Sequence, residues 1–222
     1  MFHVEHRQTN SLTALLLQSA AELCISLPSA SVPQFMIYLE ELRNWNKSIN
    51  LTAIEDDREI VIKHFVDSLA ITRWVELPSG ASLLDIGSGA GFPGMPIKLV
   101  RPDLSVGFLE PNEKKAAFLR FVIGKLRLSN ATVIPSKLDA FDPTNRVYQQ
   151  YDCLTVRALR VETIGLSISN LLKPDGIAVL YRASRAEESF SLNGLALDRE
   201  VEYELPSGLG HRVLSIFSRS QT

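Results

Sequence analysis

The sequence predicts an α/β fold in which a doubly wound, mainly parallel sheet follows an N-terminal helical segment. Three observations carry this prediction. An apolar run that ends in Asp85 leads into a glycine-rich turn and then into a helix, over residues 83–100. After this unit, short apolar runs alternate with amphipathic stretches, which is the pattern of a sheet covered by helices. Before it, apolar residues recur three and four positions apart, as they do in helices.

The N-terminal part of the chain is expected to be helical. Leucines recur at helical spacing between residues 12 and 27, and a third helix is expected over residues 57–74. We expect residues 1–76 to form a helical extension that packs as one compact unit on a domain of residues 77–222. Between the first and third helices a stronger apolar stripe begins at Pro33 and includes Phe35, Leu39, Leu42, Trp45 and Ile49.

The rest of the chain is expected to alternate strands and helices. Residues 173–176 are expected to form a turn, and PSGLG to separate the last two strands. Asn112 is suited to cap the helix that follows it, whose expected apolar stripe consists of Phe118, Phe121, Val122 and Leu126. The expected strands cover residues 83–86, 105–110, 131–135, 151–156, 177–181, 200–205 and 213–217. The expected helices cover residues 94–100, 112–126 and 162–172.

The glycine-rich turn indicates a ligand site. Gly87, Gly89 and Gly91 occupy alternate positions, and a glycine lacks the Cβ that disfavours positive φ and blocks close approach of a ligand. Pro93 suits the first position of the next helix, whose free N–H groups point into the turn. A site at the carboxyl end of a first parallel strand is typical of nucleotide-binding folds.

The spacing of the turn distinguishes between nucleotide cofactors. Dinucleotide sites carry GxGxxG, whereas this turn is GxGxG after Asp85. That form resembles the first motif of Rossmann-like S-adenosylmethionine-dependent methyltransferases, in which Asp85 would orient the loop and favour the ammonium of the cofactor. Glu110 ends the second strand about twenty residues later, where a carboxylate binds ribose hydroxyls. The alternative is that the glycines only form a tight turn and Glu110 only ends a strand.

The composition fits one compact domain with an extension. Of the 222 residues, 45% are hydrophobic and 22% are charged, and no apolar run approaches the roughly 20 residues that cross a bilayer. The first residues lack a signal-peptide pattern, so we expect a cytoplasmic protein without membrane contact; we also expect a monomer. The net charge of −2 neither indicates nor excludes a nucleic-acid partner, because a local patch decides binding.

The two cysteines do not indicate a reactive or metal-binding site. Cys24 and Cys153 lie far apart in apolar surroundings, and both are expected to be small buried hydrophobic residues. Since no Cys or His spacing indicates zinc, no metal is expected.

Longer segments resemble a single family. They are residues 44–70 (NWNKSINLTAIEDDREIVIKHFVDSLA), 85–103 (DIGSGAGFPGMPIKLVRPD) and 110–120 (EPNEKKAAFLR), followed by SKLDAF, YDCLTVRAL and KPDGIAVLYRAS. In these segments the chain is similar to the bacterial glucose-inhibited division protein B family, which methylates guanine N7 in small-subunit ribosomal RNA. The NLT and KHFVDSL stretches are more specific than the glycine loop, because generic methyltransferases lack them.

The resemblance implies roles for four positions around the cofactor. Gly87 and Phe92 match loop positions that contact S-adenosylmethionine. Leu138 and Asp139 match the pair after the third strand that flanks the adenine. The glycine-rich turn and the end of the second strand already suggest cofactor-binding roles for Gly89, Gly91, Asp85 and Glu110.

The resemblance also implies two candidate catalytic residues. Arg157 matches the arginine that ends the fourth strand, at the reactive end of the cofactor, so it is a candidate for both cofactor binding and catalysis. His64 and Asp67 match a motif of the helical extension that faces the same cleft. The structural alternatives are that His64 is satisfied by a neighbour, that Asp67 caps a helix and that Arg157 is an ion-pair partner.

Methylation of guanine N7 suits this sparse set of residues. N7 carries an in-plane lone pair and needs no deprotonation, so positioning can supply most of the acceleration. The resemblance implies methyl transfer from S-adenosylmethionine to N7 of a guanine in small-subunit (16S) ribosomal RNA, either free or within a subunit particle. Two alternatives stay open: a methyltransferase that acts on a small molecule, and a non-enzymatic regulator that binds a dinucleotide.

Overall fold

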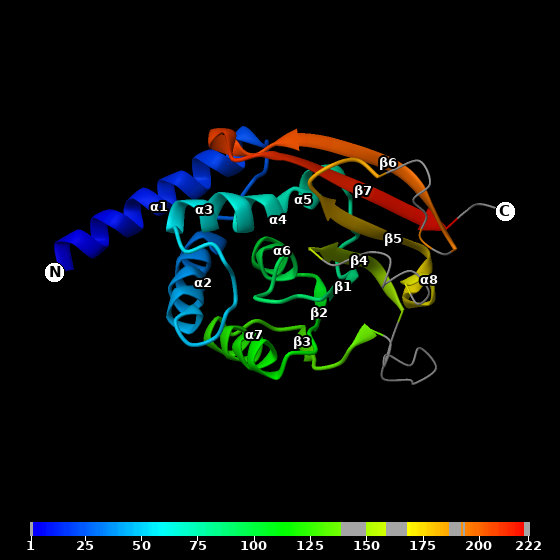
Figure 1. Ribbon diagram of the computed structural model, residues 1–222, viewed down its shortest axis with the longest axis horizontal. Helices are drawn as coiled ribbons and strands as arrows, with labels where there is room; N and C mark the ends of the chain where they lie inside the picture. Colours follow the sequence, from blue (N-terminus) through cyan, green and yellow to red (C-terminus); the bar gives the residue numbers. More distant parts are fainter. Residues whose placement is uncertain (1, 139–149, 159–167, 187–191, 193, 220–222) are drawn as a thin grey trace.

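The computed structural model describes residues 2–138, 150–158, 168–186, 192 and 194–219. Within these residues, seven strands form one sheet, and the N-terminal helices lie beside it (Figure 1). The strands are β1 (Ser82–Ile86), β2 (Ser105–Leu109), β3 (Ala131–Ile134), β4 (Tyr151–Arg157), β5 (Leu172–Arg182), β6 (Leu195–Glu204) and β7 (His211–Arg219).

The sheet is mainly parallel, as the sequence predicts. Its strand order is β3-β2-β1-β4-β5-β7-β6. The pairs from β3 across to β5 are parallel, whereas β7 runs antiparallel to both β5 and β6. The carboxyl ends of the parallel strands therefore meet at one edge of the sheet, which is where a doubly wound sheet binds its ligand.

The extension is helical, as expected, but its third helix is irregular. The first two helices are α1 (Phe2–Glu22) and α2 (Ser31–Asn46). A π-helical turn, η1 (Val61–Val66), then interrupts the third helix and contains His64. Such a turn re-aims the side chains around it and is frequent at functional sites. The α-helical pieces on either side of η1 are α3 (Asp57–Ile60), α4 (Asp67–Leu69) and α5 (Ile71–Trp74).

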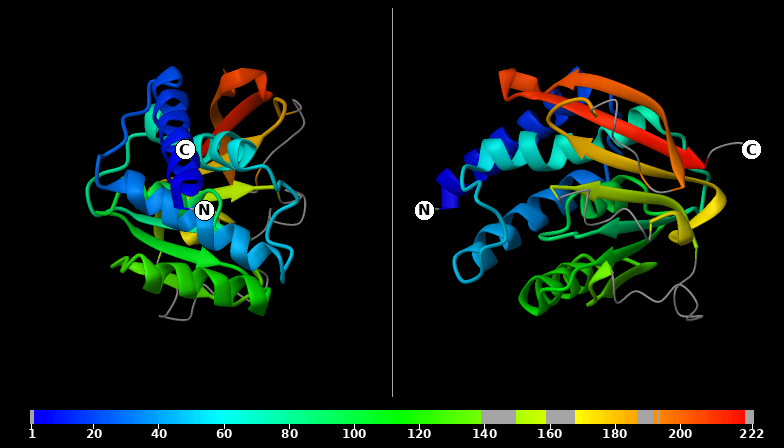
Figure 2. Two further views of the ribbon diagram at one scale, coloured as in Figure 1. Left: turned by 90° about the vertical axis from the view of Figure 1, so that its left-hand side faces the viewer. Right: turned by 45° about the vertical axis from the view of Figure 1, so that its right-hand side comes forward.

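The two faces of the sheet meet different helices, because successive side chains of a strand point to opposite faces. Leu83 of β1 joins a larger core that also contains side chains of α1 and α2. Leu84 and Ile86 join a smaller core on the other face. Figure 2 shows α1 and α2 (blue) on the same side of the sheet as α7 (green). The helices that alternate with the strands are α6 (Gly94–Val100), α7 (Glu113–Lys125) and α8 (Ile168–Leu171).

The start of α7 agrees with the sequence-based expectation, whereas the start of α6 differs from it by one residue. Asn112 caps α7, because its side-chain oxygen accepts hydrogen bonds from the backbone N–H groups of Lys114 and Lys115. This confirms the predicted cap. Pro93 precedes α6 at its N-cap position, one residue earlier than expected.

The predicted turn over residues 173–176 is wrong. These residues belong to β5, in which Leu172 pairs with Tyr151 and the regular register resumes where Ile177 pairs with Cys153. The intervening residues form a bulge opposite Asp152, and the Lys173 Nζ lies 2.7 Å from the Asp152 carboxylate. Turn-forming residues therefore lie within an irregular strand here, beside the ion pair between Lys173 and Asp152. The helix expected over 162–172 lies mostly outside the described residues.

Two packing predictions are wrong at single residues. Cys153 is buried, as expected, but Cys24 is exposed; it follows the end of α1 with φ of +55°, between the buried residues Leu23 and Ile25. Phe121 is 39% exposed although it was expected on the buried face of α7. Its ring instead lies 5.3 Å from the ring of Trp45 on α2, so the two rings pack between the extension and α7. Within the described residues, no helix is long and apolar enough to cross a membrane.

Substituting Gly94 by alanine is expected to destabilise the fold. The new Cβ would lie 2.8 Å from an Asp85 carboxylate oxygen and 2.9 Å from the Phe108 ring, and overpacking of a core costs about 1–3 kcal/mol. Gly124→Ala in α7 is the matched control, because nothing lies within 4 Å of its Cβ and alanine favours a helix by about 0.5–1 kcal/mol. Urea unfolding measures both free energies, and equal stability of the two variants would contradict this packing.

Candidate active site

The glycine loop follows β1 at the carboxyl edge of the sheet. Gly87, Gly89 and Gly91 have φ angles of +70°, +58° and +106°, which confirms that each needs the left-handed freedom of glycine. A Cβ at Gly89 would meet only the Gly87 carbonyl oxygen, at 3.9 Å, whereas a Cβ at Gly91 would lie 2.9 Å from the Tyr38 hydroxyl oxygen. The loop is therefore open at Gly89 and tightly packed at Gly91.

Glu110 ties the end of β2 to this loop. Its carboxylate is buried, with the residue 6% exposed. One oxygen accepts a hydrogen bond from Gly89 N at 2.7 Å, and the other accepts from Asn112 N at 2.8 Å. Because each carboxylate oxygen can accept more than one hydrogen bond, Glu110 retains acceptor capacity next to the open part of the loop.

Asp85 lies beneath the loop and is fully buried. Its Oδ2 accepts a hydrogen bond from Gly94 N at 3.1 Å, and its Oδ1 accepts from Thr155 Oγ1 of β4 at 2.9 Å. Burial raises the pKa of Asp85 to about 6. The carboxylate thus orients the backbone at the start of α6 and is joined to β4.

Arg157 ends β4 and binds the helical extension. Its Nη2 donates to the Lys63 carbonyl oxygen at 2.5 Å and lies 3.0 Å from Asp67 Oδ2. Its Nη1 donates to Ser68 Oγ at 3.3 Å. The structure therefore confirms that Arg157 is an ion-pair partner, and 15% of its side chain stays exposed.

Asp67 does not cap a helix, so that alternative is wrong. It is 1% exposed, and its Oδ1 accepts a hydrogen bond from the Tyr203 hydroxyl at 2.7 Å. Its Oδ2 pairs with Arg157 and lies 3.5 Å from Arg212 Nε. The carboxylate therefore joins the extension to β4, β6 and β7.

His64 is a neutral imidazole with a defined tautomer. Its Nδ1 lies 3.3 Å from Arg157 Nη2, and a guanidinium can only donate, so the proton is on Nε2 and is donated to Thr52 Oγ1 at 2.7 Å. Burial and the charge of Arg157 lower the pKa of His64 to about 3. The ring stacks on Phe92 of the glycine loop, with centroids 4.5 Å apart and planes at 18°.

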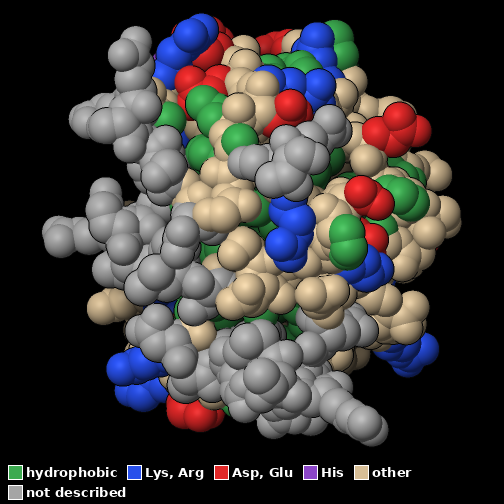
Figure 3. Space-filling view, turned by 90° about the vertical axis from the view of Figure 1, so that its right-hand side faces the viewer, with side chains coloured by type: hydrophobic (Ala, Val, Ile, Leu, Met, Phe, Trp, Pro, Cys, Tyr) green, Lys and Arg blue, Asp and Glu red, His purple; other side chains and the backbone are tan. Residues whose placement is uncertain are grey.

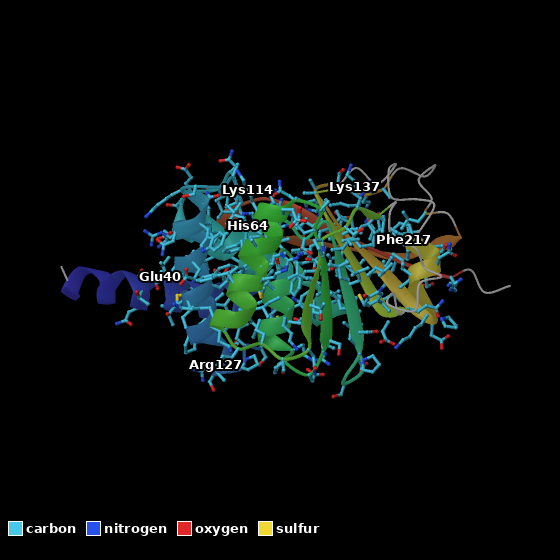
Figure 4. The ribbon with its side chains drawn as sticks, turned by 90° about the horizontal axis from the view of Figure 1, so that it is seen from below. Glu40, His64, Lys114, Arg127, Lys137 and Phe217 are labelled. Carbon is cyan, nitrogen blue, oxygen red and sulfur yellow. The ribbon has the colours of Figure 1, made fainter. Side chains whose placement is uncertain are left out.

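His64 lies toward the edge of the molecule at which β2 and β3 end (Figure 4). Figure 4 shows His64 toward the edge occupied by Lys114 and Lys137, which follow β2 and β3, while Arg127 lies at the opposite edge. Leu138 is half-buried and packs against the smaller core. Asp139 lies outside the described residues.

Two residues at the site were missed. The Tyr38 hydroxyl of α2 donates to the Ala90 carbonyl oxygen of the loop at 2.5 Å, and Thr52 fixes the tautomer of His64. The sequence contains a feature that could have indicated each of these two residues. Tyr38 follows Phe35 by three positions on the buried stripe, where a polar hydroxyl needs a partner, and Thr52 belongs to the NLT stretch.

A hollow lies between α2 and the segment that leads into α3. A pocket of about 240 Å³ opens beside Thr52. The face shown in Figure 3 carries basic and acidic side chains intermingled among its described residues. No group of three or more His, Cys, Asp or Glu in the described part of the chain could hold a metal ion. The pocket is lined by Leu42, Arg43, Asn46, Lys47, Thr52, Ile54, Glu55 and Ile60.

The sheet order and the glycine loop define a Rossmann-like S-adenosylmethionine-dependent methyltransferase fold. A solved S-adenosylmethionine-dependent methyltransferase from Aquifex aeolicus is similar, with a TM-score of 0.55 and 16% identity over 76% of this chain and 96% of that one. MtNAS in complex with MTA and tNA has a TM-score of 0.57 and 14% identity over 86% of this chain and 75% of that one. At such identities these structures show the fold alone.

The chain belongs to the GidB family, rRNA small subunit methyltransferase G, whose family model matches residues 31–204. A relative of this description from Roseiflexus sp. is 46% identical over 148 residues, 65% of this chain and 62% of that protein. Relatives from Pelotomaculum thermopropionicum and Acetivibrio thermocellus are 35% and 32% identical and cover 88% and 95% of this chain, and 85% and 90% of their own lengths. The chain spans only 61–62% of the length of the Roseiflexus sp. relative and of two other relatives, from Desulforamulus reducens and Roseiflexus castenholzii.

The buried imidazole is expected to lower stability in acid. The pKa of His64 is about 3 in the folded chain and about 6.5 when unfolded. As the pH falls from about 6.5 toward 3, the unfolded state binds a proton that the folded state does not, so the free energy of unfolding falls. At pH 5 the loss is on the order of 2 kcal/mol.

The measurement compares the parent chain with His64→Gln, whose side chain does not titrate. Urea unfolding at pH 7.5 and pH 5 should show that the variant loses less stability on acidification than the parent. The difference between the two losses should be about 2 kcal/mol. Every other titrating group is shared by the two chains, so the difference isolates His64. Parallel pH dependence in the two chains would contradict the neutral, buried imidazole.

Proposed function

We propose that this protein transfers a methyl group from S-adenosylmethionine to N7 of a guanine in small-subunit (16S) ribosomal RNA. Membership of the rRNA small subunit methyltransferase G family supports the reaction. The observation that carries the proposal is the pairing of an open glycine, Gly89, with the buried carboxylate of Glu110 at the end of β2. A dinucleotide-binding regulator would need the other glycine spacing.

The residues present fit the proposed cofactor. The space beside Gly89 would be filled by any Cβ, and Glu110 has acceptor capacity for ribose hydroxyls at the end of the second strand. The buried negative charge of Asp85 complements an ammonium group. When bound, the cofactor supplies an electrophilic methyl group on a sulfonium.

The chain is proposed to bind and position rather than to transfer protons. The guanidinium of Arg157 cannot take up a proton, and both ring nitrogens of His64 are already hydrogen-bonded. Guanine N7 attacks with its own lone pair, so no base is needed, and orientation can supply roughly 7–11 kcal/mol of the barrier. His64 is proposed to support Phe92 by stacking, and Arg157 to orient the reactants at the end of β4.

The remaining site roles are proposals of the same kind. Residues 1–76 are proposed to act as the extension and residues 77–222 as the catalytic domain of a cytoplasmic monomer. The RNA is free or part of a subunit particle. The proposed cofactor-binding residues are Asp85, Gly87, Gly89, Gly91, Phe92, Glu110, Leu138, Asp139 and Arg157.

The function is tested with the purified chain, S-adenosylmethionine and ribosomal RNA from a strain that lacks this activity. One arm uses deproteinised small-subunit RNA and the other uses intact subunit particles. Digestion and mass spectrometry should detect N7-methylguanosine in at least one arm, and chemical cleavage at the modified base then locates it. Methyl transfer to another atom, or no transfer to RNA while a small molecule is methylated, would refute the proposal.

Replacing Glu110 by alanine is expected to weaken binding of S-adenosylhomocysteine by about 1.5–3 kcal/mol, the range for hydrogen bonds to a charged group. Titration calorimetry measures the change. The 2′-deoxy analogue provides the internal control, because it lacks one of the hydroxyls that Glu110 is proposed to bind. The loss of affinity that follows removal of the 2′-hydroxyl should be smaller in Glu110→Ala than in the parent. Equal losses in the two proteins would show that Glu110 is not the ribose partner.

A further inference from the structure

We infer that Tyr38, on α2 of the extension, is a positioning residue for the cofactor loop, an inference that rests on the proposed function. Its side chain is fully buried, and its hydroxyl donates to the Ala90 carbonyl oxygen at 2.5 Å. Ala90 lies between Gly89 and Gly91 and is 3% exposed. Within the described residues no other donor reaches this carbonyl. A tyrosine 52 positions upstream therefore satisfies a buried backbone group of the loop.

The tyrosine ring is held on several sides by other aromatic rings. It stacks on Phe65 with centroids 5.3 Å apart and planes at 20°, and on Phe118 at 6.3 Å and 25°. Phe92 of the loop lies 5.6 Å away. A tyrosine side chain has only two main torsions, and these contacts fix both, so the hydroxyl is a rigid donor rather than an adaptable one.

The loop is shaped to pass directly against this hydroxyl. At Gly91 a Cβ would lie 2.9 Å from the Tyr38 oxygen, and φ is +106°. The space that a side chain at position 91 would need is thus partly occupied by the hydroxyl. The glycine and the tyrosine fit one another across the boundary between the extension and the sheet.

Two anchors act on adjacent residues of the loop. Glu110 accepts a hydrogen bond from Gly89 N at 2.7 Å, and Tyr38 donates to Ala90 O. Together they fix the backbone at the open glycine, where the cofactor is proposed to bind. Without the hydroxyl, the Ala90 carbonyl would be left buried without a donor, which is unfavourable, and the loop would have to shift to reach water. Burial raises the pKa of Tyr38 well above its usual value of 10, so the phenol keeps its proton.

The test is Tyr38→Phe, which keeps the ring and removes only the hydroxyl. Titration with S-adenosylhomocysteine should show a dissociation constant raised about tenfold, the size expected from leaving a buried acceptor unpaired. KM for the cofactor should rise in parallel, while kcat at saturating substrates and KM for the RNA should stay within about twofold. Tyr151→Phe is the matched control: this residue is 4% exposed but lies at the amino end of β4, so cofactor affinity should not change.

Hydrogen exchange separates a positioning role from simple packing. The N–H groups of Gly91 and Phe92 donate to the Ser88 carbonyl oxygen at 2.7 and 3.0 Å. In Tyr38→Phe these amides should exchange faster while those of β1 stay protected. A lowered melting temperature with unchanged affinity and unchanged loop exchange would overturn the inference. If the parent chain itself binds no S-adenosylhomocysteine, the proposed function fails and the inference fails with it.

Discussion

The buried ion pair between Arg157 and Asp67 is the interaction on which the arrangement of the site depends. Arg157 Nη2 lies 3.0 Å from a carboxylate that is 1% exposed, and leaving such a charge without its partner costs several kcal/mol. The two residues must therefore stay together. Asp67 comes from the extension, Arg157 from the end of β4, and Tyr203 and Arg212 from β6 and β7 complete the surroundings of the carboxylate. The pair consequently fixes three parts of the chain relative to one another at the carboxyl edge of the sheet.

The same arginine determines the state of His64. Its positive charge and the burial of the ring keep the imidazole neutral, and its N–H groups assign the proton to Nε2. A neutral ring can stack on Phe92 without bringing a second positive charge next to Arg157. Thr52 completes this chain of contacts from the loop between α2 and α3. The extension thus forms one wall of the site, and its π-helical turn is the feature that brings His64 over the loop.

The sequence predicts the regular parts of this fold and the glycine loop because both depend on local residue preferences. The positive φ of Gly89 and the cap at Asn112 follow from the residues themselves. The π-helical turn and the bulge in β5 do not, since each involves contacts between distant segments; in the bulge, Lys173 of β5 pairs with Asp152 of β4. For the same reason the sequence offered Arg157 as either an ion-pair partner or a site residue, and only the fold shows that it binds the extension. Tyr38 was missed because its place on the buried stripe shows only that its hydroxyl needs a partner, and does not show that this partner is the Ala90 carbonyl oxygen.

Asp85 shows why a site residue can oppose stability. Its pKa is about 6 in the folded chain and near 4 when unfolded, so the unfolded state releases its proton first as the pH rises between these values. Above pH 6 the ionised carboxylate lowers the free energy of unfolding by on the order of 3 kcal/mol. Hydrogen bonds from Gly94 N and Thr155 offset only part of the desolvation. A chain selected for stability alone would replace this buried charge by an apolar side chain, as in other cores where that change is neutral or stabilising. Its presence beneath the loop therefore supports the proposal that its charge attracts a positive ligand group.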